Sequence, residues 1–389
     1  MIWTEERIMS ARVFLRRPES VLITVTGACL LLGTTGAAGA VECVPPAEQP
    51  GVLRMLAAES RKTFDGLRTW EGVFEVDDVE FYFGERATRF LDDHAPNLTD
   101  RPAEFKKLNH ARVTFAVDCA RDLLLSRFES TDVCLVGLDS GQRLDVTLIP
   151  FIQTTIVTPE FSLQFSSNVR VAAAEGPGRR LAYLGAREEV ARQEWGIVVD
   201  PREFPRGYGR PTWENLQMTA EFVELNGRLE IDGLALRVEK EGSGDQQEYR
   251  VVLPGKAGPG RYLFQEMTFR ADAGFNTTQV VMRETTGPVR QQMRWAYLRQ
   301  DDLWLPSFIE RTVMTADGKR TTTQRTLRLV DSRANRALPA EVFTYRSLGL
   351  ADEDQMLDER SGQLSVYRQG ELIPLDSSTS ESPARSAEP

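Results

Sequence analysis

The side chains best able to do chemistry in this sequence are carboxylates, because its 389 residues include only two histidines and four cysteines. A pair of carboxylates can cleave a glycosidic bond, one as the acid and the other as the base or nucleophile. Three acidic clusters could supply such a pair: Asp77-Asp78, Glu188-Glu189 and Asp352-Glu353-Asp354. Each is more simply a solvated surface or turn. The sequence has no G-x-S-x-G, H-E-x-x-H or C-x-x-C motif, so we predict no enzyme, no cofactor and no metal site.

The cysteines predict a crosslink. Beyond the first 40 residues the chain has Cys43, Cys119 and Cys134, and its histidines are His94 and His110. These residues lack the close spacing of zinc ligands. Cys119 and Cys134 lie in or just after two segments typical of adjacent strands, and an exported protein meets an oxidising compartment. We therefore predict a disulfide between Cys119 and Cys134, with buried thiols as the alternative, and assign no role to Cys43.

Residues 1–40 have the organisation of a secretory signal peptide. Three arginines, an apolar run and a small-residue cleavage site follow one another: Arg12, Arg16 and Arg17, then Val21–Leu32, then Ala38-Gly39-Ala40. The apolar run is too short to span a bilayer comfortably. A faint lipidation box ends at Cys29, but apolar residues continue past it. We expect cleavage before Val41 and an exported protein of the periplasm or cell envelope, with the extracellular space as the second choice.

Charge and composition exclude some partners. The chain has a net charge of −10 and 41% hydrophobic residues. Nucleic acid and anionic membrane surfaces repel an acidic chain. A chain of this length can also bury a large core. The sequence therefore predicts a globular protein with no nucleic-acid partner and no membrane span after residue 40, and it leaves the oligomeric state open.

Five alternating segments between residues 260 and 333 predict an antiparallel meander: 262–270, 277–284, 289–300, 303–315 and 320–330. Turn sequences separate them, including Gly287-Pro288 and Asp317-Gly318. Side chains alternate between two faces only in an extended chain, so this periodicity indicates strands.

The rest of the chain adds helices and further strands. Apolar residues at three- and four-residue spacing predict helices near 50–68 and 213–225. Strands are expected at 70–83, 111–119, 122–129, 144–149, 153–157, 161–165, 228–231, 234–239 and 248–253. An irregular stretch at 84–109 holds a short helix near 85–91. A rigid loop rich in Pro and Gly is expected at 200–211. We divide the chain into a signal peptide (1–40), a sheet domain (41–340), a C-terminal hairpin extension (341–375) and a disordered tail (376–389).

One face of the meander is apolar and the other is charged. Six residues, mostly Met and aromatic, share the apolar register: Leu263, Met267, Phe269, Met293, Trp295 and Tyr297. A sheet covered on one side needs such a face to pack against its own helices. The same face could instead be a concave surface that holds a hydrophobic ligand. A closed core and a dry ligand pocket are built from the same types of residue, so the packing interpretation and the ligand interpretation both stay open.

The C-terminal half resembles a known group of proteins. The features that carry the resemblance are Trp304-Leu305-Pro306, a hairpin at 315–319, Leu338-Pro339, Val342-Phe343, and Leu348-Gly349-Leu350 with Asp358 and Tyr367. Their order is similar to that in uncharacterised bacterial exported proteins related to the LolA-like periplasmic lipoprotein carriers and lipid-binding sensors. The resemblance implies a mainly β (α+β) fold, in which a large curved antiparallel sheet forms an open half-barrel, a few helices cover it, and acyl chains lie between them.

The function expected from this resemblance is noncatalytic. We expect an exported protein that binds or senses a hydrophobic envelope molecule, an acyl chain or an acylated protein, at the six residues named above. The alternative is a structural or protein-interaction module of the envelope whose sheet is filled by its own side chains, and a hydrolase is the weakest choice. The chain is much longer than a typical carrier, which counts against lipoprotein transfer itself.

Overall fold

The computed structural model describes residues 41–146, 148, 150–171, 179–185, 206–207, 210–231, 233–258, 261–284 and 287–375. The predicted signal peptide and the predicted tail at 376–389 therefore lie outside the described residues, as do Glu188, Glu189 and most of the loop at 200–211. The division into a sheet domain and a C-terminal extension stays a prediction.

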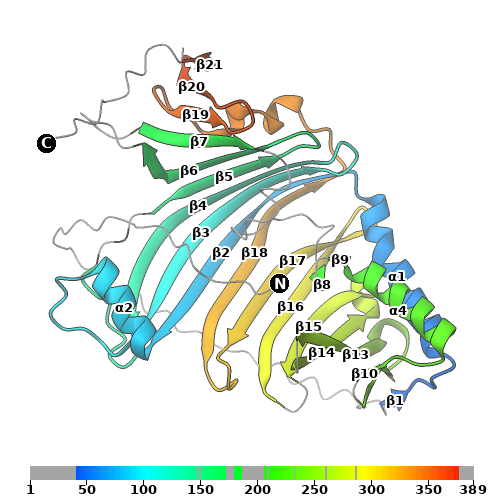
Figure 1. The fold of residues 1–389 in the computed structure, drawn as a ribbon. Coiled ribbons are helices and arrows are strands. Elements are labelled where there is room, and N and C mark those ends of the chain that lie inside the picture. The colour runs from blue at the N-terminus through cyan, green and yellow to red at the C-terminus, as the bar shows by residue number, and fades with distance from the viewer. Residues whose placement is uncertain are drawn as a thin grey trace, which may run out of the picture.

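One curved sheet of 17 strands dominates the fold (Figure 1). In spatial order its strands are β1 (Glu42–Cys43), β12 (Arg237–Glu241), β13 (Glu248–Gly258), β14 (Arg261–Arg270), β15 (Asn276–Glu284), β16 (Val289–Gln300), β17 (Leu303–Met314), β18 (Thr321–Ala334), β2 (Thr69–Phe83), β3 (Glu104–Asp118), β4 (Leu123–Gly137), β5 (Ile152–Val157), β6 (Ser162–Val171), β7 (Arg179–Gly185), β19 (Gln355–Asp358), β20 (Gln363–Arg368) and β21 (Glu371–Pro374). Neighbouring strands are antiparallel except β7 and β19, which are parallel.

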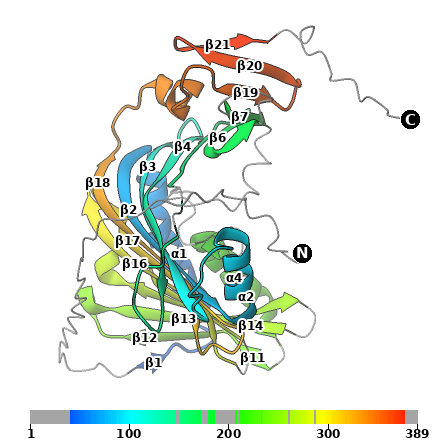
Figure 2. The ribbon, with the colours of Figure 1, turned by 90° about the vertical axis from the view of Figure 1, so that its left-hand side faces the viewer.

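The sheet curves but does not close. Its end strands, β1 and β21, are far apart in the sheet order, and Figure 2 shows them at opposite ends of the curve. The N-terminal strands join the C-terminal meander through β2, which pairs with β18. The predicted fold class, a mainly β protein with an open half-barrel, is confirmed.

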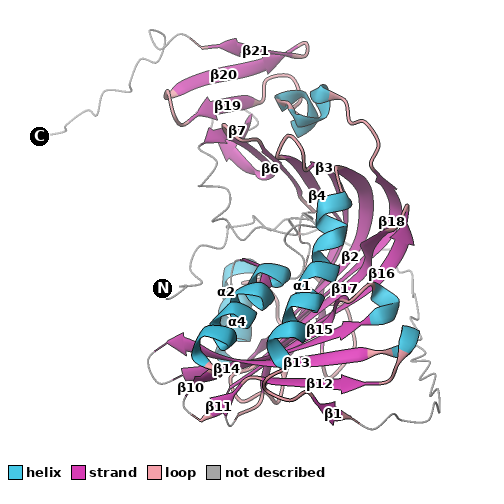
Figure 3. Cartoon of the chain, turned by 90° about the vertical axis from the view of Figure 1, so that its right-hand side faces the viewer, coloured by secondary structure: helices cyan, strands magenta, loops and turns pink. Residues whose placement is uncertain are grey.

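Three helices are described: α1 (Gln49–Gly66), α2 (Gly84–His94) and α4 (Thr212–Asn226). They lie inside the curve of the sheet (Figure 3). The apolar spacing seen in the sequence places Leu53 and Leu56 of α1 and Leu216 and Ala220 of α4 in the core. Among the described residues, no helix is long and apolar enough to cross a membrane.

Short elements complete the fold. Two small hairpins pair β8 (Arg206–Gly207) with β9 (Arg210–Pro211), and β10 (Glu230–Ile231) with β11 (Leu234–Ala235). Single turns follow at η2 (Gly244–Gln246), η3 (Ala271–Ala273), η4 (Ala340–Phe343) and η5 (Tyr345–Leu348). Phe343 and Leu348 pack with Leu125 and Phe165 in a second core, on the sheet face opposite to that covered by α1 and α4.

Glycine is required at two turns of the meander. Gly274 and Gly318 have φ values of 62° and 67°, in the left-handed region that other residues rarely adopt. A Cβ would also collide with Trp304 at the first position and with Pro288 at the second. The turns that separate the alternating segments are therefore fixed by backbone geometry and by close packing together.

Two expected elements were wrong. Residues 104–109, expected to be irregular, begin β3, because all of β2 pairs with this strand. The strand expected at 144–149 is absent from its described residues, which belong to a loop held by bonds from the Leu144 N–H to the Leu135 carbonyl and from the Gly137 N–H to the Gln142 carbonyl. Alternation over so few residues did not distinguish a strand from this loop.

The predicted disulfide between Cys119 and Cys134 is also wrong. Asp118 lies opposite Leu123, whereas Cys134 lies opposite Leu108. The two cysteines are thus about eleven residues apart along the strands, or roughly 35 Å at about 3.3 Å per residue. A disulfide requires Cα atoms within about 7 Å. The strands are adjacent as expected, but they are longer than their sequence pattern indicated.

The thiols provide a direct check on this register. Alkylation of the denatured protein without reductant should label both Cys119 and Cys134, because neither can reach the other in the fold. Reduction should leave the unfolding midpoint unchanged. A mass spectrum in which both cysteines escape labelling until reductant is added would contradict the register of β3 and β4.

Candidate functional site

The apolar face of the meander lies under α1 and α4. We call the buried residues that meet there the apolar cluster: Leu53, Leu56, Val76, Leu216, Ala220, Val280, Met267, Phe269, Trp295, Ile309 and Leu327. Met267, Phe269 and Trp295 come from the set predicted to bind a ligand, and they are 1%, 0% and 4% exposed. The face is therefore closed by the protein's own helices in this structure.

The other predicted residues adjoin the same cluster. Met293 and Tyr297 are partly buried and pack against it. Met293 and Met267 share one face, since Val280 lies between them and opposite both. The backbone of Leu263 belongs to β14, but its side chain is outside the described part of the structure. The structure thus brings five of the six predicted side chains together.

Polar contacts hold the two helices at several points, and one of them is the bond from the Asn335 side-chain amide to the Gly66 carbonyl at the end of α1. The Ser60 hydroxyl of α1 donates to the Phe275 carbonyl at 2.9 Å. Arg54 of α1 pairs with Glu224 of α4 on the exposed surface. Apolar side chains of both helices belong to the apolar cluster and add to their attachment to the sheet. Such apolar contacts are non-directional, so the helices can shift without breaking an extended hydrogen-bond network.

Two aromatic side chains bring polar atoms into this apolar region. The Tyr297 hydroxyl donates to the Thr277 carbonyl at 2.8 Å, and burial raises the pKa of this phenol. The indole N–H of Trp295 is buried and has no hydrogen-bond partner within the described parts of the chain. Buried polar groups are nearly always paired, so this N–H requires an explanation.

The concave face becomes charged beyond the apolar cluster. Val76 and Leu327 face each other across β2 and β18, and the next pair on the same face is Asp78 and Arg325. An Arg325 guanidinium N–H donates to Asp78 Oδ2 at 2.6 Å. Asp78 is 8% exposed, so this ion pair is largely removed from water.

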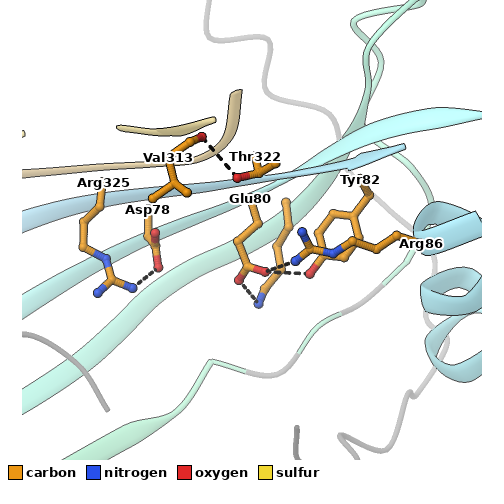
Figure 4. Close-up of polar contacts among 8 residues, drawn as sticks. Asp78, Glu80, Tyr82, Arg86, Val313, Thr322 and Arg325 are labelled. Atoms are coloured by element: carbon orange, nitrogen blue, oxygen red, sulfur yellow. Dashed lines mark hydrogen bonds and ion pairs between the residues drawn. The ribbon is translucent and has the colours of Figure 1, made fainter. Parts of the chain in front are cut away.

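A second charged group continues the row. Glu80 follows Asp78 on the same face of β2, and Figure 4 shows both carboxylates on one side of the strands. Lys107 lies 3.1 Å from Glu80 Oε1, and the Tyr82 hydroxyl donates to Glu80 Oε2 at 2.7 Å. We call Asp78, Glu80, Lys107 and Arg325 the polar belt.

The environment of Glu80 changes its pKa. Burial alone would raise the pKa of this carboxyl, but Lys107, Tyr82 and Arg86 outweigh burial, and the net shift is downward. Burial is also the main cause of the raised pKa of Tyr82, with the charge of Glu80 adding to it. Tyr82 therefore stays protonated and donates to an ionised Glu80.

The pKa of Glu80 predicts a pH effect on stability. A carboxyl with a folded-state pKa below its unfolded value stabilises the fold above the unfolded value, and this contribution is lost as the pH falls through the folded value. Glu80→Gln should therefore be less stable than wild type near pH 7. The difference in free energy of unfolding should shrink as the pH falls below the ordinary Glu value of 4.5. Urea titrations above and below this value measure it, and a constant difference would contradict the assignment.

A groove is found outside the polar belt. It has a volume of about 960 Å³ and lies between the loop after α2 and the loop after β4. Pro96, Leu98 and Arg101 line one side, and Arg143 and Leu144 line the other. Arg101 is already bonded to the Leu98 and Pro96 carbonyls. The sequence pattern gave no sign of this groove, because both of its walls are irregular loops.

The acidic clusters do not form catalytic pairs in the described residues. Asp77 and Asp78 point to opposite faces of β2, where Asp77 contacts Arg328 and Asp78 contacts Arg325. In the third cluster, Asp354 is bonded to Arg180. No group of three or more His, Cys, Asp or Glu that could hold a metal is found in the described ranges.

Sequence reasoning missed the polar belt. Asp78 and Arg325 are 247 positions apart, so no local pattern joins them. A signal was nevertheless present, because Asp78 and Glu80 occupy the same alternate positions as the apolar Phe74 and Val76. A charge in the apolar register of a strand is a reason to look for a buried partner.

Comparison with known proteins finds structural likeness alone. No protein-family model and no curated protein matches the chain. A LolA superfamily protein from Nitrosomonas europaea has 10% identity and a TM-score of 0.31, with 76% of this chain and 99% of that chain covered. An outer membrane lipoprotein-sorting protein domain from Vibrio parahaemolyticus has 12% identity and a TM-score of 0.32, with 77% and 99% covered. A DUF1329 family protein from Desulfovibrio piger has 11% identity and a TM-score of 0.25, with 77% and 99% covered.

These structures include the group that the sequence resembles. Their TM-scores and identities are low, so nothing about a ligand or partner of this chain follows from them. Any function has to be inferred from the residues of its own concave face.

Proposed function

We propose that this protein is a noncatalytic, exported binder of a hydrophobic molecule, and that an acyl chain of this molecule lodges between the sheet and the helix pair α1 and α4. The apolar cluster supplies the walls of such a site. The helices are attached mainly by apolar contacts, which a hydrocarbon chain can replace with little loss, since chain and side chains bury similar surface. The ligand therefore enters where the helices separate from the sheet.

The indole N–H of Trp295 is the observation that carries this proposal. It is buried among apolar side chains without a partner in the described structure. An unsatisfied buried donor costs about 1 to 3 kcal/mol. In a sheet that served only as a core, a side chain without a polar atom at this position would avoid that cost. A ligand with an oxygen near its chain gives the N–H an acceptor.

The outer surface of α4 supports the proposal. Leu216, Ala220 and Val223 face the core, but Met218, Phe222 and Leu225 on the same helix are 50%, 47% and 85% exposed. Their spacing places them on one stripe. Because α4 has apolar residues on two sides, it can stay in contact with an acyl chain while the helix moves relative to the sheet.

Titration with a fluorescent fatty-acid probe tests the proposed function. The probe should bind saturably and quench Trp fluorescence, and Trp295→Phe should remove most of the quenching and weaken binding, because it removes the indole N–H that donates to the ligand oxygen. Trp304→Phe is the matched control, because Trp304 stacks near Arg299 outside the apolar cluster and should leave the quenching unchanged. Absence of saturable binding would contradict the proposal.

The second candidate is a structural or protein-interaction module of the envelope. The burial of Met267, Phe269 and Trp295 to 4% exposure or less favours it, because a closed core needs no ligand. Native mass spectrometry of protein purified from its own envelope separates the two functions. Co-purified lipid is expected for the binder, and protein at its bare mass together with no probe binding is expected for the module.

A further inference from the structure

Two polar atoms at the border of the apolar cluster lack partners. Asp78 Oδ1 and Arg325 Nε are both buried, and neither has a hydrogen-bond partner in the part of the chain that is described. One is an acceptor and the other is a donor. They belong to the same ion pair on adjacent strands. One additional donor for Asp78 Oδ1 and one additional acceptor for Arg325 Nε, placed close together, would satisfy both atoms.

The position of this pair relates it to the hydrocarbon site. Val76 and Leu327, 1% and 3% exposed, are the neighbouring pair on the same face and belong to the apolar cluster. Arg311 lies opposite Arg325 on one side and Met293 on the other, and its guanidinium donates to the Gln291 amide oxygen at 3.3 Å. A chain that enters the apolar cluster would therefore end within reach of Asp78 and Arg325.

The atoms without partners limit the kind of group that fits. Cations outnumber carboxylates around the belt, because Glu80 pairs with both Lys107 and Arg86 and because Arg311 lies opposite Arg325. A carboxylate ligand nevertheless offers acceptors only, and would leave Asp78 Oδ1 without a donor. An ester offers acceptors only, and would leave Oδ1 without a donor. An amide offers an N–H for Oδ1 and a carbonyl for Nε.

We infer that the Asp78–Arg325 pair is the polar end of the ligand site, and that it takes an uncharged head group that both donates and accepts hydrogen bonds, such as an amide. This inference rests on the proposed function, since the head group is fixed only if its chain lies in the apolar cluster. It predicts which head group the protein prefers among amphiphiles that have the same acyl chain.

Competition among three ligands of equal chain length tests the preference. Dodecanamide, methyl dodecanoate and dodecanoate are each used to displace the fluorescent probe from the full exported chain. Dodecanamide should bind at least about tenfold more tightly than the ester, because bonds to charged groups are among the stronger hydrogen bonds. Dodecanoate should also bind more weakly than dodecanamide, because it has no donor for Asp78 Oδ1.

Two double variants test whether Asp78 and Arg325 cause the preference for the amide. Asp78→Leu with Arg325→Met removes both buried charges together, and should bind the amide and the ester with affinities within about threefold of each other. Asp77→Leu with Arg328→Met is the matched control, because it removes an ion pair at the neighbouring positions of the same strands on the opposite face. This control should keep the full preference. If the first variant does not fold, Asp78→Asn with Arg325→Gln replaces it.

The outcomes separate this inference from the proposed function. Equal affinity of the wild type for amide and ester, with the probe still bound, would overturn the head-group inference and leave the proposed function standing. A preference that persists in Asp78→Leu with Arg325→Met would also overturn it. A wild type that binds no probe contradicts the proposed function, and the head-group inference falls with it.

Discussion

Trp295→Ala should lower the free energy of unfolding by about 3 to 5 kcal/mol, because a large buried ring leaves a cavity that its neighbours fill only in part. Trp295 is 4% exposed and belongs to the apolar cluster, to which both helices contribute side chains. Urea denaturation measures the loss. The size of the effect tests whether α1 and α4 rest on the sheet in solution as they do in the structure.

Trp304→Ala is the control for this measurement. Trp304 is partly buried and lies outside the apolar cluster, so its removal should cost clearly less. Equal losses for the two variants would show that the position under the helices is not special. A loss below about 1 kcal/mol for Trp295→Ala would mean that the helices are already separated from the sheet.

Arg180→Met should destabilise the protein by about 3 to 5 kcal/mol, because it leaves a buried carboxylate without its cation. Arg180 donates to both oxygens of Asp354, at 3.0 and 2.5 Å, and Asp354 is 5% exposed. The same carboxylate accepts the Ala351 N–H at 2.7 Å. The pair therefore fixes the start of β19 against β7.

The loss of stability in Arg180→Met should be greatest in the strands that the Arg180–Asp354 pair holds in place. β19 is held to β7 by a short parallel ladder, from Gln355 opposite Leu181 to Asp358 opposite Leu184. Hydrogen exchange in Arg180→Met should increase first in β19, β20 and β21, since these strands reach the main sheet through this ladder. Uniform exchange across the whole sheet would contradict a local role for the pair.

Two further variants control for charge. Arg360→Met removes the partner of Asp358 in an ion pair whose arginine is about half exposed, and should cost clearly less than Arg180→Met. Arg180→Met combined with Asp354→Leu removes both buried charges, and should recover much of the stability lost in the single variant. Failure of the double variant to recover would assign the loss to packing of Arg180 on Phe165, whose ring centre is 4.9 Å from the guanidinium carbon.

The sequence was sufficient for the elements of this fold because their signals are local. Alternation over eight to thirteen residues identified β14 to β18, and three- and four-residue spacing identified α1 and α4. Short or irregular segments were less informative, as the loop around Leu144 shows. The two-faced character of the meander also followed from alternation, since side chains at even and odd positions of a strand must face opposite sides.

The tertiary structure alone decided which residues meet. Alternation fixes the face of Cys134 and of Asp78, but not the strand register that separates Cys134 from Cys119 or that places Arg325 beside Asp78. The register of β3 and β4 depends on how far each strand extends, and the pairing of β2 with β18 joins segments about 250 residues apart, which no local pattern records. For the same reason, the sequence by itself determined that Met267 and Trp295 face an apolar side of the sheet, and only the docking of α1 and α4 decided that this side is covered.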